Sequence, residues 1–212
     1  MSVVITGASR GIGAGLAAAY AARGEEVIGT TRDGQYPLEV TDPASHAAFA
    51  QQLAGRSGDL LICNAGVYLD KGQVLEDGYP PEQWAQSFAT NVTGVFLTVQ
   101  SLLPQLRASQ AGRIAIISSQ MASSERAPGG SYIYRSSKAA VLNLGRNLAT
   151  DLMPEGIAVG IYHPGWVQTD MGSAAAEITV DEAVSGLVDR FDALDVTRTG
   201  VFETWDGRPH AF

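Results

Sequence analysis

The 212-residue sequence predicts one α/β domain, spanning residues 1–212, with a doubly wound parallel sheet of about seven strands and helices on both faces. Short apolar runs alternate with helical patterns along the whole chain. A glycine-rich turn joins the first apolar run to the first helix, and small polar residues follow several later runs. Ligands bind such sheets at the carboxyl ends of the strands, so the residues that follow each strand are the candidate site residues.

The composition excludes several classes of protein. Hydrophobic residues make up 45% of the chain and charged residues 17%, as in a folded domain with a sizeable core. The net charge of −8 and the scattered basic residues argue against nucleic acid as a partner. No apolar run has membrane length or the pattern of an export signal, and a single cysteine, Cys63, fits a reducing compartment. We therefore expect a cytoplasmic protein that does not bind membranes.

A metal site is not expected. The three histidines are His46, His163 and His210, and their positions show no metal-ligand spacing.

The first apolar run leads directly into a turn that suits a dinucleotide. Residues 3–5 form a short strand, residues 6–13 read Thr-Gly-Ala-Ser-Arg-Gly-Ile-Gly, and a helix follows to about residue 23. Gly7 and Gly11 let the backbone turn tightly and approach a pyrophosphate, and Gly13 allows close packing of the helix. The helix N-terminus supplies amide donors and a positive potential. This arrangement predicts the first half of a Rossmann-type unit.

The end of the second strand, expected over residues 26–30, indicates which dinucleotide binds. Residues at this position meet the adenosine ribose, and here they include Arg32 instead of an acidic residue. Arg32 can pair bidentately with a 2′-phosphate, and Arg10 can face the same group. We predict NADP(H) as the cofactor. Asp33 keeps NAD(H) open as the less favoured alternative, because a shift of one residue would place a carboxylate near the ribose.

The remaining elements alternate in the same way. We expect further strands over residues 37–40, 59–63, 112–119, 156–162 and 200–203, and helices over residues 41–54, 82–90, 91–106, 131–153 and 179–191. The first of these helices is capped by Thr41 or Asp42, and the last by Thr179. The polar loop over residues 67–81 is expected to overhang the substrate. The sequence assigns no role to residues 205–212.

The helix expected over residues 131–153 places Tyr134 and Lys138 one turn apart on the same face. A free phenol has a pKa near 10. A positive charge about 4 Å away is worth roughly 4 kcal/mol at an effective dielectric of about 20, which would lower that pKa by about three units at most. Such a pair can exchange protons near pH 7. The same spacing also occurs by chance in helices, so the rest of the chain has to support the prediction.

Polar residues also follow three other strands. Asn64-Ala65-Gly66 leaves room for a cofactor, and Pro164-Gly165 makes an abrupt turn. Ser118 and Ser119 end another strand, fifteen residues before Tyr134 in the case of Ser119. Either serine can be the functional one, and Ser119 is favoured. Asn91, taken alone, is a helix cap or a solvated residue.

Together these motifs resemble the signatures of the short-chain dehydrogenase/reductase family. Residues 132–140 and 164–172 are similar to the branch that contains the C-factor proteins and the sniffer-type carbonyl reductases. The resemblance implies a catalytic set of Asn91, Ser119, Tyr134 and Lys138. It implies cofactor contacts from Gly7, Ser9, Arg10, Gly11, Ile12, Gly13, Arg32, Glu39, Val40, Asn64, Ala65, Gly66, Tyr134, Lys138, Pro164, Gly165, Val167 and Thr169.

The expected reaction is the reduction of an aldehyde, ketone or quinone to an alcohol by hydride from NADPH. Tyr134 would protonate the developing alkoxide, and Ser119 would orient the carbonyl. Lys138 would lower the pKa of Tyr134 and hold the nicotinamide ribose. Asn91 would hold a water molecule that links Lys138 to solvent.

The sequence leaves the substrate open. A short lid over residues 172–178 and a pocket bordered by Tyr68, Trp166 and Met171 favour a small or flat carbonyl compound. The alternative function is an NADP(H)-binding signalling or redox-sensing protein of the C-factor type with little turnover. The presence of all four catalytic side chains favours the enzyme. The resemblance also implies a homodimer or homotetramer.

Overall fold

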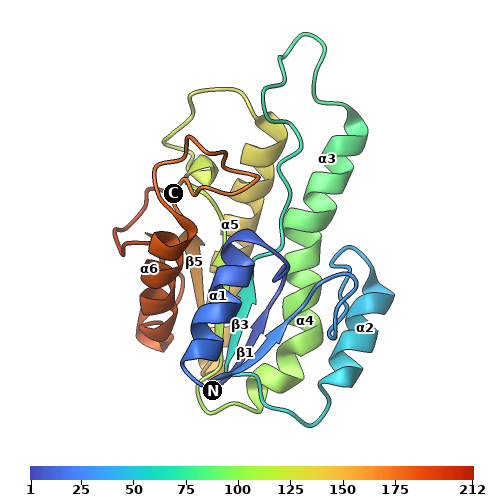
Figure 1. Ribbon diagram of the computed structural model, residues 1–212, viewed down its shortest axis with the longest axis vertical. Helices are drawn as coiled ribbons and strands as arrows, with labels where there is room; N and C mark the ends of the chain where they lie inside the picture. Colours follow the sequence, from blue (N-terminus) through green and yellow to red (C-terminus); the bar gives the residue numbers. More distant parts are fainter.

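A six-stranded parallel sheet forms the middle layer of the computed structural model, which describes all 212 residues (Figure 1). The strand order is β2-β1-β3-β4-β5-β6. The strands are β1 (Ser2–Ile5), β2 (Glu26–Gly29), β3 (Leu60–Cys63), β4 (Arg113–Ile117), β5 (Ala158–His163) and β6 (Phe202–Thr204). The helices are α1 (Gly11–Ala22), α2 (Pro43–Gln52), α3 (Pro81–Phe88), α4 (Gly94–Arg107), α5 (Tyr132–Leu152) and α6 (Val180–Asp192).

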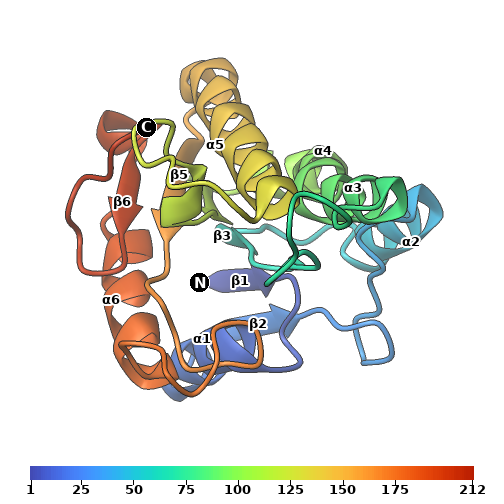
Figure 2. The same cartoon turned by 90° about the horizontal axis from the view of Figure 1, so that it is seen from above.

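The helices cover both faces of the sheet, as the doubly wound prediction requires. Seen from above, α1 and α6 lie on one face and α2, α4 and α5 on the other (Figure 2). Successive strand residues point to opposite faces. In β3, Leu60 and Ile62 therefore join the core under α1 and α6, whereas Leu61 and Cys63 join the core under α2, α4 and α5. Cys63 is a buried core residue, and burial raises the pKa of its thiol to about 12.

The sheet has one strand fewer than the seven expected, because residues 37–40 do not form one. Only an isolated bridge joins Thr31 to Pro37, and the Leu38 amide donates to the Thr31 carbonyl at 2.8 Å. Pro37 has no N–H with which to continue a ladder. The amide of Glu39 instead donates to Ser45 Oγ at 2.9 Å, so the segment bends toward α2.

A π-helical turn over Ala89–Thr93 joins α3 to α4 into one continuous rod. The sequence predicts two helices in this region, with Asn91 at their junction. Asn91 is not a helix cap: it lies inside the π turn and is 1% exposed. A π turn adds one residue to a helical turn and recurs at functional sites.

The expected helix caps are found at two places. The Asp42 side chain, not that of Thr41, accepts from the Ala44 amide at the start of α2. Thr179 caps α6 and forms a reciprocal capping box with Glu182. Three short 3₁₀ helices complete the structure, at Gln120–Ala122, Met153–Glu155 and Val196–Arg198.

Residues 205–212 fold back beside β6 and onto the loop that follows β4. The His210 amide donates to the Phe202 carbonyl at 2.8 Å, and the Ser124 amide donates to the Phe212 carbonyl at 3.0 Å. The Arg146 guanidinium lies 4.1 Å from the centre of the Phe212 ring. This segment therefore packs over the loop that begins at Ser119. None of the helices combines the length and the apolar character needed to cross a lipid bilayer.

Candidate active site

The glycine-rich turn lies at the carboxyl end of β1 and opens α1. Gly7 and Gly11 have φ angles of 69° and 54°, a conformation that favours glycine. A Cβ atom at Gly13 would lie 2.2 Å from the Gly7 carbonyl oxygen. Gly7 and Gly11 therefore permit the tight turn, and Gly13 permits close packing against it, whereas the approach to a pyrophosphate stays a prediction. Helix α1 has no side-chain cap and no acidic residue in its first turn, so its first amides remain available to an anion.

The motif after β3 is tied to the turn after β1. Asn64 donates its side-chain amide to the carbonyls of Thr6 and Gly7 at 3.0 and 3.1 Å. The backbone amides of Asn64 and Ala65 both donate to Thr6 Oγ1, at 3.0 and 3.1 Å. A Cβ at Gly66 would lie 3.2 Å from Asn91 Oδ1 and 3.6 Å from Lys138 Nζ. Gly66 therefore brings the backbone close to the residues predicted to be catalytic.

The turn after β5 meets the glycine-rich turn from the other side. A Cβ at Gly11 would lie 3.3 Å from the Thr169 methyl group. Gly165 has a φ of 90°, and Val167 is 4% exposed. Arg10 forms an exposed ion pair with Asp170 across this gap. Residues predicted from three separate motifs, in the turns after β1, β3 and β5, thus gather at one edge of the sheet.

The residues predicted to select the cofactor lie just past β2. Arg32 and Asp33 are both exposed, and Arg32 forms no ion pair. The Glu39 carboxylate accepts from the amide and the hydroxyl of Thr41, at 3.1 and 2.9 Å. Val40 is 8% exposed, and its carbonyl contacts His46 Nε2 at 3.0 Å. Among these residues, Arg32 is the cation free to meet a phosphate.

Tyr134 and Lys138 are both buried on α5. Lys138 Nζ lies 5.7 Å from the centre of the Tyr134 ring and donates to the Ile117 carbonyl at 2.9 Å. Burial lowers the pKa of Lys138 to about 8. Burial also raises the pKa of Tyr134 above its ordinary value, and the Ser119 side chain acts in the opposite direction. The predicted lowering by Lys138 is not found: the ammonium group lies over the ring and is bonded to a carbonyl.

The two serines after β4 have different partners. Ser118 Oγ donates to the Lys138 carbonyl at 3.0 Å, and this hydroxyl holds α5 against the sheet. Ser119 is 7% exposed, accepts from the Met121 amide at 3.1 Å, and lowers the pKa of Tyr134. Of the two alternatives, Ser119 is the serine whose side chain acts on Tyr134.

The Asn91 side chain connects α5 to the loop after β3. Its Oδ1 accepts from the Val67 amide at 2.8 Å, and its Nδ2 donates to the Val67 carbonyl at 2.9 Å. The same Nδ2 donates to Ser137 Oγ at 2.9 Å, and that hydroxyl donates to the Tyr134 carbonyl at 2.8 Å. Both the oxygen and the nitrogen of the Asn91 side-chain amide are therefore hydrogen-bonded within the protein.

Two residues of the loop after β3 make contacts in the site that the sequence does not predict. The Tyr68 ring stacks on Tyr134, with 4.2 Å between ring centres, and its hydroxyl hydrogen-bonds Ser131 Oγ at 2.5 Å. Asp70 is fully buried, and its carboxylate accepts from the amides of Ile133 and Tyr134. Asp70 lies more than sixty positions from these partners, and no local sequence pattern marks such a contact.

The other predicted pocket residues lie at the rim. Met171 Sδ is 4.0 Å from the Tyr134 hydroxyl, and the Met171 side chain is 40% exposed. Trp166 is 43% exposed and donates from Nε1 to the Gly172 carbonyl at 2.7 Å. The residues after β5 therefore cover the hydroxyl of Tyr134, with an apolar thioether next to it.

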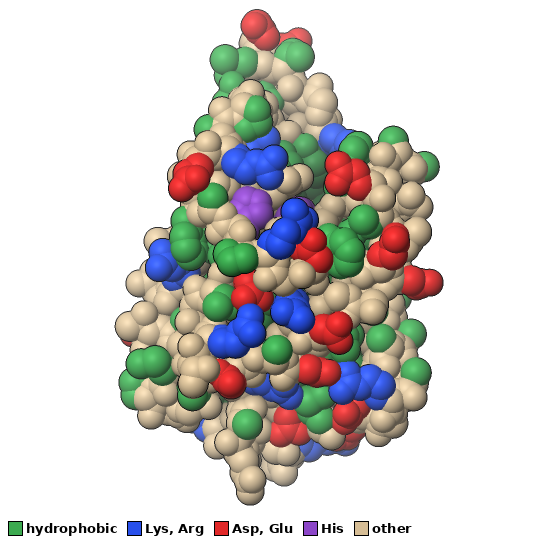
Figure 3. Space-filling model, turned by 90° about the vertical axis from the view of Figure 1, so that its left-hand side faces the viewer, with side chains coloured by type: hydrophobic (Ala, Val, Ile, Leu, Met, Phe, Trp, Pro, Cys, Tyr) green, Lys and Arg blue, Asp and Glu red, His purple; other side chains and the backbone are tan.

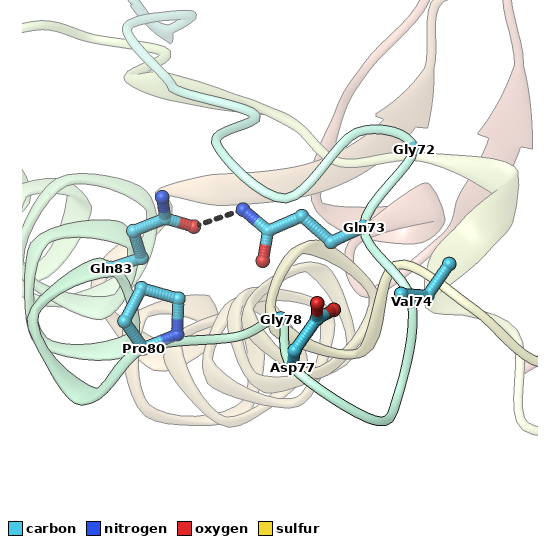
Figure 4. A pocket seen from close by; sticks show the side chains of 7 residues that line it. All are labelled: Gly72, Gln73, Val74, Asp77, Gly78, Pro80 and Gln83. Carbon is cyan, nitrogen blue, oxygen red and sulfur yellow. Dashed lines mark hydrogen bonds between the residues drawn. The ribbon is translucent and has the colours of Figure 1, made fainter.

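Two surface cavities flank this region. One, of about 370 Å³, lies in the loop that projects at the top of Figure 1, where Gln73 bonds Gln83 at 2.7 Å (Figure 4). The other, of about 460 Å³, lies between the C-terminal segment and the turn after β5, and His163 and Arg126 contribute to its lining. On this side of the molecule basic and acidic side chains are interspersed, and a histidine lies in the upper half (Figure 3). No group of His, Cys, Asp or Glu side chains is arranged to hold a metal ion.

Comparisons with known proteins agree with this architecture. Residues 1–180 match the family described as short chain dehydrogenase. C-signal of Myxococcus xanthus is 36% identical over 161 residues, which cover 76% of this chain and 96% of that protein. The 3-oxoacyl-acyl-carrier-protein reductase FabG of Escherichia coli strain K12 is 31% identical over 191 residues, which cover 82% of this chain and 76% of FabG.

Two solved carbonyl reductases share the fold over the full length of the chain. The NADPH-bound enzyme from chicken fatty liver has a TM-score of 0.90 at 32% identity, covering 100% of this chain and 98% of that one. Sniffer of D. melanogaster has a TM-score of 0.91 at 23% identity, covering 100% and 99%, and shows the fold alone. The match to the family over residues 1–180, together with these relatives, establishes that the chain belongs to the short-chain dehydrogenase family.

Proposed function

We propose that this protein is an NADP(H)-dependent oxidoreductase that reduces the carbonyl group of a small aldehyde, ketone or quinone to an alcohol. The observation that carries the proposal is the burial of Tyr134 and Lys138 together, with Ser119 acting on the phenol, at the edge where the strands end. A structural tyrosine or lysine would not need this combination. Family membership supports an oxidoreductase, and the similarity to carbonyl reductases supports this class of substrate.

The chain's own residues account for the proton transfer. The phenol of Tyr134 is held in its protonated form by burial, so it can donate a proton to the oxygen of a reduced carbonyl. The Ser119 hydroxyl can hydrogen-bond the same oxygen and orient the substrate. Lys138, whose pKa is about 8, can supply or accept a proton near neutral pH. NADPH, when bound, supplies the hydride.

The turn after β1 fits the dinucleotide. Positive φ angles at Gly7 and Gly11 and the uncapped N-terminus of α1 form a cradle for the pyrophosphate. A side chain at Gly66 would crowd the approach to Lys138. Arg32 would pair with the 2′-phosphate, because it is exposed and has no carboxylate partner. Arg10 would contribute after leaving Asp170. These contacts favour NADPH over NADH.

The first experiment measures NADPH oxidation with a panel of aldehydes, ketones and quinones, with NADH in parallel. We expect turnover that prefers NADPH. Tyr134→Phe should lower kcat at least about a hundredfold, since a general acid contributes roughly that factor or more, and should leave NADPH affinity nearly unchanged. Tyr132→Phe is the matched control, because Tyr132 lies on the same helix and is 37% exposed. Normal turnover by Tyr134→Phe would contradict the assignment.

The similarity to C-signal favours one alternative, a protein that binds NADP(H) and signals with little turnover. Tight NADPH binding without reduction of any carbonyl compound in the panel would support this alternative. We also propose a cytoplasmic homodimer or homotetramer in which α4 and α5 pack against a second copy.

A further inference from the structure

Asp70 is a fully buried carboxylate without a cationic partner. Its side chain is 0% exposed, and none of the ion pairs in the protein includes it. An ionised carboxylate in the interior is costly unless hydrogen bonds replace its lost hydration. Asp70 therefore depends on the N–H groups that point toward it.

Those N–H groups belong to the first turn of α5. The Ile133 amide donates to Oδ2 at 2.8 Å, and the Tyr134 amide donates to Oδ1 and Oδ2 at 3.2 and 3.3 Å. The residue preceding the helix, Ser131, has a φ of 48° and does not cap it with its own side chain. Asp70 thus caps α5 from a distant loop, and a negative charge at this end of a helix is favourable.

The segment that carries Asp70 is held in place on the opposite side. Asn91 brackets the Val67 backbone with two hydrogen bonds, and Tyr68 both stacks on Tyr134 and bonds Ser131. Between these anchors, Asp70 holds the backbone amide of Tyr134 itself. The loop thus contacts Tyr134 through its ring and through its main chain.

The groups that face Tyr134 and affect its protonation come from three elements. Burial is the largest cause of the raised pKa of Tyr134, and Tyr68 and Asp70, from the loop after β3, raise it further. Lys138, on α5, lies over the ring face. The Ser119 hydroxyl, from the end of β4, lowers this pKa. Removing the Asp70 charge should therefore make the phenol easier to ionise.

We propose that Asp70 is a positioning residue for Tyr134: its buried carboxylate fixes the first turn of α5 and places a negative charge beside the backbone of Tyr134. The inference rests on the proposed reductase function. Asp70 does not touch the reacting atoms, and it acts only through the backbone and the electrostatic environment of Tyr134.

The test compares Asp70→Asn and Asp70→Ser with wild type. Asn keeps the shape and removes the charge, and Ser is a neutral residue that can still cap a helix. Asp42→Asn is the matched control, since Asp42 caps α2 at an exposed position. We expect both Asp70 variants to lower kcat at least about tenfold with NADPH affinity within about twofold of wild type. The basic limb of the kcat profile should move to lower pH, because reduction requires the protonated phenol.

Hydrogen exchange at the amides of residues 133 and 134 supplies a readout that does not depend on turnover. These amides should exchange at least about tenfold faster in the Asp70 variants than in wild type. Their exchange rates should be unchanged in Asp42→Asn. If wild type reduces no carbonyl compound, the proposed function fails. The exchange data still test whether the Asp70 carboxylate holds the first turn of α5.

Three outcomes would overturn the proposal. The first is a kcat within about twofold of wild type, and the second is a loss of activity with an unmoved pH profile. The third is failure of both variants to fold, which would make Asp70 a requirement for folding instead of a positioning residue.

Discussion

Burial, more than pairing of opposite charges, sets the protonation of the two central side chains. Tyr134 and Lys138 are 7% and 5% exposed, and desolvation is the largest influence on the pKa of each. Desolvation disfavours the charged form, so the phenol holds its proton more tightly and the ammonium group less tightly. Both changes suit a site in which Tyr134 donates a proton and Lys138 titrates close to neutral pH.

The lowered pKa of Lys138 predicts a stability effect that depends on pH. Between about pH 8 and the ordinary pKa of 10.5, the unfolded chain binds more protons at this group than the folded chain. The charged lysine therefore costs stability below pH 8, by as much as about 3 kcal/mol, and this cost disappears as pH rises toward 10.5. Lys138→Met should stabilise the protein relative to wild type more at pH 7 than at pH 9.5.

Urea unfolding at the two pH values checks this prediction. The matched control is Lys71→Met, which removes the only other lysine of the chain, an exposed one. Its effect on the free energy of unfolding should be small and should not vary with pH in this way. An equal effect of Lys138→Met at both pH values would contradict the prediction.

At the scale of elements, some helices begin at a cap encoded nearby in the sequence, and others begin at a cap supplied by a distant segment. Thr179 and Glu182 form the capping box of α6 from residues three positions apart, a pattern visible in the sequence. Asp70 caps α5 from a loop that the sheet brings to it. The π turn at Ala89–Thr93 also depends on a distant segment, because Asn91 there hydrogen-bonds the loop after β3.

The capping box predicts a modest and local stability effect. Thr179→Ala should lower the free energy of unfolding by about 1 kcal/mol, because the Glu182 amide loses its acceptor. Thr150→Ala is the matched control: Thr150 is exposed within α5, and alanine favours a helix interior. Chemical denaturation of both variants provides the comparison. A loss as large in Thr150→Ala would show that the effect is not due to capping.

At the scale of the whole molecule, parallel strands bring three distant motifs to one edge of the sheet. The turns after β1, β3 and β5 meet there, and α5 places Tyr134 and Lys138 beside them. The C-terminal segment packs against the loop after β4, where the Ser124 amide donates to the Phe212 carbonyl. Helices α4 and α5 lie next to each other on the same face of the sheet, and Phe96 on α4 is 40% exposed (Figure 2).

This arrangement predicts self-association through α4 and α5. Light scattering after size-exclusion chromatography should give a mass two or four times the chain mass of 22.2 kDa. Phe96→Glu should reduce the mass toward that of one chain, because a carboxylate would be buried in the interface. Val74→Glu, at a 56% exposed position in the projecting loop, should leave the mass unchanged. A wild-type protein with the mass of one chain would contradict the proposal.

Much of the fold could be predicted because its signals are local. Alternating apolar runs marked β1, β3, β4 and β5, and the glycine spacing marked the turn that opens α1. The strand expected over residues 37–40 was wrong because a short segment with Leu38 and Val40 does not reveal whether a neighbouring strand completes the ladder. The choice between Ser118 and Ser119 also needed three dimensions, since adjacent residues at a strand end point in opposite directions.

Apart from the strand expected over residues 37–40, the sequence by itself determined the order of the strands and helices. It also determined the glycines that require a positive φ and the spacing that places Tyr134 and Lys138 on one face of α5. These features follow from backbone geometry within a few residues. Only the tertiary structure decided that burial governs the pKa values of Tyr134 and Lys138. It also decided that the Asn91 side chain hydrogen-bonds the Val67 backbone and that Asp70 caps α5. Such features arise from contacts between distant segments, and desolvation is a property of the packed molecule and not of any single stretch of chain.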